Sequence, residues 1–133
     1  MNKSLVEYIE SRIIPMYDGF DAGHGRDHVR AVIEEAVRLA GFYPVDLNMV
    51  YAAAAYHDTG LSVDRKTHHL ESGRIVREDR GLRRWFTEPQ IEVIAQAAED
   101  HRASLRVKVL NSFFPPVGVM ENIVVAGPSM LSR

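Results

Sequence analysis

The segment that most constrains the fold is residues 49–60, which read Met-Val-Tyr-Ala-Ala-Ala-Ala-Tyr-His-Asp-Thr-Gly. From Val50 to His57 its inward positions follow the spacing of one face of a helix. The four consecutive alanines leave room for other helices to approach closely. Asp46 is a good N-cap for this helix, and Gly60 is predicted to end it as a C′ residue.

The same helical period recurs on both sides of this segment, and we find no convincing strand before residue 104. Thr67 is a candidate cap for the following helix, and Thr87–Gln90 reads as a capping box with proline in the first turn. We therefore expect an all-α bundle of about five to six helices with short connections. The other predicted helices run from about Leu5 to Pro15, from Asp27 to Gly41, from His68 to Asp79 and from Ile91 to His101.

Composition narrows the class of protein. A chain of 133 residues is most simply a single domain. Its net charge of −2 and pI of about 6.3 do not indicate binding to a nucleic-acid polymer. It has no cysteine, which excludes disulfides and thiolate ligands. The N-terminus lacks the apolar core of a signal peptide, and no stretch is apolar enough for a membrane span, so we expect a cytoplasmic protein without membrane contact.

All six histidines fall near predicted helix ends. His57 is expected to point inward, and Asp58 should project about 100° further around the helix. Two such side chains should not touch each other, yet both can reach one ion near the helix end. The remaining histidines are His24, His28, His68, His69 and His101.

Imidazole and carboxylate ligands suit a divalent metal ion: Mn, Fe, Ni, Co or Zn, and Mg with more water. Such an ion activates water and polarises a phosphoryl oxygen. Cationic side chains that lie beside the histidines are candidates for phosphate binding, namely Arg26, Arg65, Lys66 and Arg102. Taken singly, each histidine is more simply a hydrogen-bonded core or surface residue, and each arginine a solvated one. The joint pattern is what favours a metal site.

At these residues the chain resembles the HD-domain superfamily of metal-dependent phosphohydrolases, over roughly residues 20–104. The resemblance is carried by four segments: Gly23-His-Gly-Arg-Asp-His-Val-Arg-Ala-Val32, Ala52-Ala-Ala-Ala-Tyr-His-Asp-Thr-Gly60, His68-His-Leu-Glu-Ser-Gly73 and Ala97-Ala-Glu-Asp-His-Arg-Ala-Ser104. It implies an HD-domain-like helical bundle. It also implies hydrolysis of a small phosphorylated molecule, such as a nucleotide or another phosphate ester.

The resemblance also implies roles for single residues. His28 matches the first metal ligand, and His57 with Asp58 matches the doublet that names the family. His69 and His101 match positions that serve a second metal or contact phosphate, so they are predicted as metal ligands and, with Asp58, as catalytic residues. His24 neighbours the first ligand and is grouped with the substrate-binding residues. Whether one or two ions bind stays open, as does the oligomeric state.

One departure stands out. The family pattern expects a further metal-binding aspartate on a later helix, but no aspartate follows Asp100. The composition changes after Ser104, which suggests that residues 105–133 are a truncated or frame-altered end of the domain. Two alternatives to an enzyme therefore stay open. One is a degenerate HD domain that binds a nucleotide or a partner without catalysis, and the other is a structural domain with core histidines.

Overall fold

A computed structural model of the chain describes residues 1–100, except for the side chain of Ala22. Every regular element in that part is a helix, which confirms the predicted all-α class. The α-helices are α1 (Lys3–Arg12), α2 (Arg26–Ala40), α3 (Leu47–Tyr56), α4 (His68–Glu78) and α5 (Glu88–Glu99). Short 3₁₀ helices join them: η1 (Ile14–Gly19), η2 (Ala22–His24), η3 (Thr59–Ser62) and η4 (Arg80–Arg84). The predicted site residues His101 and Arg102, and the predicted tail 105–133, lie outside the described residues.

Local sequence signals set most of the helix starts. The Asn2 side chain accepts a hydrogen bond from the Leu5 N–H and caps α1. The Asp46 carboxylate accepts from two N–H groups in the first turn of α3, as predicted. Thr87 and Gln90 form the predicted capping box at α5. Each of these bonds satisfies N–H groups that a helix start leaves without a partner in the helix.

Two predicted helix boundaries, the cap at the start of α4 and the stop at the end of α3, were wrong in detail. Thr67 precedes α4 but makes no side-chain cap bond, because its backbone is not in the extended conformation that such caps adopt. The α3 helix ends at Tyr56, so Gly60 is not its C′ residue but lies inside η3. Glycine is required at position 60 because η3 packs closely against the backbone of α4.

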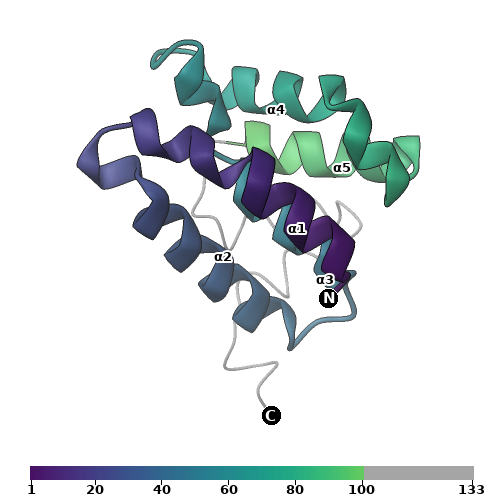
Figure 1. Cartoon of the computed structure of the whole chain (residues 1–133). Coiled ribbons are helices and arrows are strands. Elements are labelled where there is room, and N and C mark those ends of the chain that lie inside the picture. The colour runs from purple at the N-terminus through teal and green to yellow at the C-terminus, as the bar shows by residue number, and fades with distance from the viewer. Residues whose placement is uncertain (101–133) are drawn as a thin grey trace.

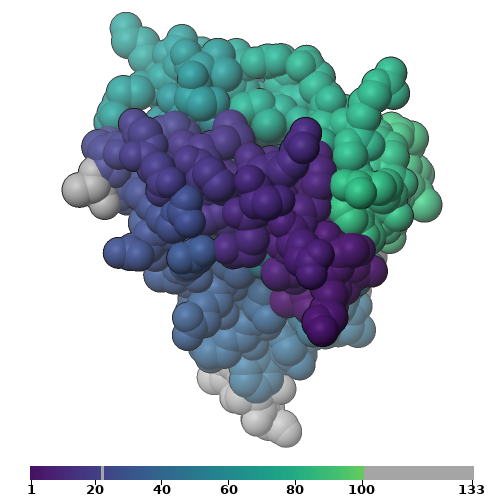
Figure 2. Space-filling model, viewed as in Figure 1, coloured from purple at the N-terminus to yellow at the C-terminus, as the bar shows by residue number. Residues whose placement is uncertain are grey.

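The α3 helix forms the centre of the bundle, because its residues Met49–Tyr56 are all buried. It packs against α2 on one side and α5 on the other, and α4 lies beside α5 (Figure 1). Its four alanines are each at most 1% exposed, so their small side chains let both neighbours come close. In Figure 2 the N-terminal residues, in purple, lie between the blue surface of α2 and the teal and green surface of α4 and α5. None of the helices in residues 1–100 is long and apolar enough to cross a membrane.

Candidate metal centre

The His57-Asp58 doublet lies immediately after α3, where the helical backbone ends. His57 donates a hydrogen bond from Nδ1 to the carbonyl of Ala54 at 2.7 Å, since a carbonyl can only accept. Its Nε2 atom therefore faces Asp58, 3.0 Å from Oδ2. The sequence predicts no direct contact between these neighbours, and that prediction is wrong. Asp58 has φ −116° and ψ 11°, so it no longer follows the helical rotation that would separate the two side chains.

A third potential ligand comes from α2. The Nε2 atom of His28 lies 4.0 Å from Oδ2 of Asp58. The ligand atoms of His28, His57 and Asp58 all lie within 4.8 Å of one another, which is close enough to bind one ion. The His57 and Asp58 side chains are 9% and 8% exposed, whereas His28 is 40% exposed. The group is thus buried on the His57-Asp58 side and open to solvent on the His28 side.

The other oxygen of the same carboxylate faces α4. The Nε2 atom of His68 lies 3.5 Å from Oδ1 of Asp58, and its Nδ1 atom donates to the carbonyl of Arg65 at 2.9 Å. The sequence places both His68 and His69 at this helix start, and a metal or phosphate role is assigned from it to His69 alone. The periodicity of a helix start does not separate two adjacent histidines. The contacts between η3 and the first turn of α4 determine that His68 lies beside Asp58.

Those contacts involve Gly60 and Ser72. The Ser72 hydroxyl accepts a hydrogen bond from the Gly60 N–H and donates one to the carbonyl of His68, each at 2.8 Å. A Cβ atom at Gly60 would lie 1.9 Å from that same carbonyl oxygen. Only glycine therefore lets η3 pack so closely on the first turn of α4, and this packing places His68 beside Asp58.

The electrostatics of the centre favour a bound cation. Burial raises the pKa of the Asp58 carboxyl, but a doubly protonated His57 that donates from Nε2, together with the positive charges of His57, His68 and His24, outweighs burial and lowers the pKa to about 2. Asp58 is therefore ionised at neutral pH. Because Nδ1 carries the proton in both His57 and His68, each Nε2 lone pair is directed at a carboxylate oxygen unless a cation lies between them. A second proton on the ring or a bound metal ion would remove this repulsion between lone pairs. The imidazole and carboxylate ligands fit a divalent ion.

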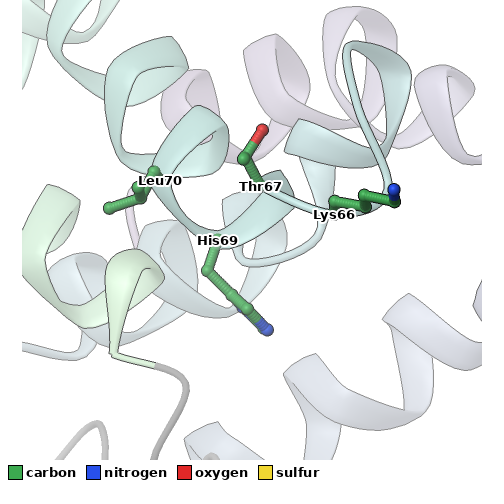
Figure 3. Close-up of a pocket in the computed structure, with 4 residues that line it drawn as sticks. All are labelled: Lys66, Thr67, His69 and Leu70. Carbon is green, nitrogen blue, oxygen red and sulfur yellow. The ribbon is translucent and has the colours of Figure 1, made fainter.

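The His69 ring packs against the ring of His68 in the first turn of α4, with the ring centres 3.8 Å apart. It lines a small pocket together with Lys66, Thr67 and Leu70, and its Nδ1 atom is buried. Figure 3 shows its ring projecting from the start of α4 in a different direction from the other three side chains. The sequence-based role of His69 in metal or phosphate binding stays a prediction.

The remaining predicted residues lie at the exposed rim. His24 donates from Nδ1 to Asp21 at 2.8 Å, and its ring centre is 5.8 Å from that of His28. Arg65 binds the other oxygen of Asp21, also at 2.8 Å, and these contacts lower the pKa of that carboxyl to about 2. Arg26 instead forms a two-point ion pair with Asp18. Thus His24 and Arg65 share one carboxylate near the candidate metal centre, whereas Arg26 is engaged elsewhere.

Comparison with known proteins gives one match. A family model described as HD domain matches residues 25–125, a range that holds His28, His57, Asp58, His68 and His69 and extends beyond Ser104. No curated protein and no solved structure matches the chain.

Proposed function

The chain belongs to the HD-domain family, and from that premise we propose that it is a metal-dependent phosphohydrolase that acts on a small phosphorylated substrate. The observation that carries the proposal is the convergence of the His28 and His57 Nε2 atoms on one oxygen of Asp58. Hydrolases of this superfamily depend on a divalent metal, and three N and O ligands with an open side suit such an ion. The substrate is proposed as a nucleotide or another phosphate ester.

Each residue has a distinct part in the proposed site. His57, Asp58 and His28 would hold the ion, which when bound supplies a Lewis acid for the phosphoryl oxygen and lowers the pKa of a water. The Ala54 carbonyl keeps the proton of His57 on Nδ1, so that Nε2 is free to bind. His68 would orient the Asp58 carboxylate through its other oxygen when its ring is doubly protonated and can donate from Nε2. The two buried residues give the site rigidity, and the exposed His28 edge gives access.

Phosphate binding is assigned to the rim. Arg65 is 72% exposed and pairs only with Asp21 among the ion pairs of the described residues, so it can turn toward an incoming phosphate. His24 shares that carboxylate and lies next to His28. Lys66 follows Arg65 in the same loop. A guanidinium and an imidazole near a metal would neutralise the charge that develops on the phosphoryl oxygens.

A second function is supported by the sequence. No aspartate follows Asp100, although the family pattern expects one on a later helix. In residues 1–100 the potential ligands that come together are His28, His57 and Asp58, and Asp100 is not among them. A domain that lacks one ligand of its centre binds metal weakly and turns over slowly. The alternative is therefore a degenerate HD domain that binds a nucleotide or a partner without catalysis.

One experiment decides between the two. The purified chain is analysed for bound metals and then assayed with Mn, Fe, Co, Ni, Zn and Mg against a panel of nucleotides and sugar phosphates. If the chain is an enzyme, a metal ion should stimulate phosphate release. His57→Ala should abolish this activity, and Tyr51→Phe, which removes a buried hydroxyl in α3, should retain it. A protein that purifies without metal and gains no activity with any of the ions supports the binding domain instead.

A further inference from the structure

The end of α3 is stopped by side chains. In a continuous helix each carbonyl accepts from the N–H four residues later. Here the carbonyl of Ala54 accepts from His57 Nδ1, and that of Tyr56 accepts from the Thr59 hydroxyl, each at 2.7 Å. Between them, the carbonyl of Ala55 accepts from the hydroxyl of Tyr17 at 2.6 Å. Two of these three donors are local, whereas Tyr17 comes from η1, 38 residues earlier in the chain.

The same hydroxyl also accepts a hydrogen bond from the Asp58 N–H at 3.3 Å. Tyr17 therefore bridges the last turn of α3 and the backbone of the residue whose carboxylate forms the centre. Its side chain has no solvent exposure, and the ring of Phe20 packs against its ring at 5.3 Å. Burial raises the pKa of the Tyr17 phenol far above its usual range, so it stays neutral and keeps the proton that it donates to Ala55.

We propose that Tyr17 is a positioning residue of the metal centre, an inference that rests on the proposed function and deepens it. Its hydroxyl holds the Asp58 backbone where the helix ends, and so sets the direction in which the carboxylate meets His57. Tyr17 also lies 11 residues before His28, on the segment that leads into α2. One buried hydroxyl thus links the part of the chain that carries His28 to the part that carries the doublet.

The test must separate positioning from simple loss of stability, and the chain offers two matched controls. Tyr51→Phe deletes the same atom from a buried tyrosine of α3 whose hydroxyl has no hydrogen-bond partner in the described part of the chain. Tyr56→Phe deletes a buried hydroxyl that is hydrogen-bonded, but to Asp79 and not to the doublet. It therefore reproduces the loss of a buried hydrogen bond next to the site without touching Asp58.

The experiment measures two quantities in the full chain and in the Tyr17→Phe, Tyr51→Phe and Tyr56→Phe variants, well below their unfolding temperatures. The first is hydrogen exchange of the Asp58 amide in metal-free protein, and the second is the Kd and visible absorption spectrum of bound Co²⁺. We expect Tyr17→Phe to speed exchange at Asp58 selectively, to weaken Co²⁺ binding roughly tenfold and to alter the spectrum. Both controls should keep Asp58 exchange and the Co²⁺ Kd within about twofold of the unmodified chain, even where Tyr56→Phe lowers stability.

Two results would overturn the proposal: unchanged Asp58 exchange and Co²⁺ affinity in Tyr17→Phe, or an equal loss of affinity in Tyr17→Phe and Tyr56→Phe. If the unmodified chain binds no Co²⁺, the proposed function fails instead. Amide exchange in the metal-free protein then decides by itself whether Tyr17 holds Asp58.

Discussion

The Nε2 atom of His57 lies 3.0 Å from Oδ2 of Asp58 while its Nδ1 atom donates to Ala54, so a neutral His57 ring presents a lone pair to the carboxylate. A second proton on His57 or a metal ion bound by both atoms would stabilise this arrangement. A helix that continued through residues 57 and 58 would have separated them. The chemistry of the doublet therefore depends on where α3 ends as much as on which residues follow it.

The first prediction concerns metal and stability. An ion that binds only the folded chain should stabilise it by about 2.7 kcal/mol at a free concentration of 100 Kd, which raises Tm by roughly 8–10 °C for a domain of this size. Thermal unfolding with and without a chelator measures the effect. His57→Ala should remove the increase, because it deletes one of three ligands. An equal Tm with and without chelator for the unmodified chain would instead favour histidines that serve only the core.

A second prediction separates the two histidines that begin α4. His68→Ala should weaken metal binding about tenfold, because Asp58 loses the imidazole that fixes its second oxygen. Titration calorimetry with Mn²⁺ provides the measurement. His69→Ala is the companion variant, since sequence reasoning assigned a ligand to His69. A loss in His69→Ala as large as in His57→Ala, with no loss in His68→Ala, would show that the Asp58–His68 contact has no part in binding.

The sequence predicted the helices well because each has a local signature. Asp46 and the Thr87–Gln90 box cap their helices where expected, and the alanine-rich helix is central because small side chains permit close packing. The position of His28 at a helix start, with Val32 one turn later, allowed it to face the same interior as the doublet, and the family resemblance then assigned it as a metal ligand. Their ligand atoms lie within 4.8 Å of one another in the structure.

What the sequence did not predict depends on contacts between distant segments. The local pattern predicts Gly60 as a helix stop, but glycine is required there by the close approach of α4, which local sequence does not indicate. His68 faces Asp58 because Ser72 and Gly60 join two segments, and a helix start alone gives no preference between His68 and His69. Tyr17 had no signal at all, since a tyrosine in a loop before the first motif resembles any core residue.

A third prediction tests the packing at Gly60. Gly60→Ala places a Cβ atom 1.9 Å from the His68 carbonyl oxygen and 2.6 Å from the Ser72 nitrogen, both of which are backbone atoms that cannot turn aside. We expect a loss of at least about 2 kcal/mol in the free energy of unfolding, measured by urea denaturation. Gly19→Ala is the matched control, because its Cβ would have no neighbour within 4 Å. Equal effects of the two substitutions would mean that η3 and α4 can separate freely.

The last prediction concerns alkaline pH. Burial raises the pKa of Tyr8 to about 12, helped by its hydrogen bond to Asp79, and burial raises the pKa of Tyr51 to about 12. Burial also raises the pKa of Tyr17 and Tyr56. A group whose pKa is higher in the folded state stabilises the fold fully below its unfolded pKa, here near 10, and that stabilisation is lost as pH rises toward 12. Four of the five tyrosines should therefore ionise above pH 10, together with unfolding.

Tyrosinate absorbance and circular dichroism, followed in one titration, measure tyrosine ionisation and unfolding together. Ionisation of most tyrosines near pH 10 in a chain that stays folded would contradict the buried positions of their hydroxyls.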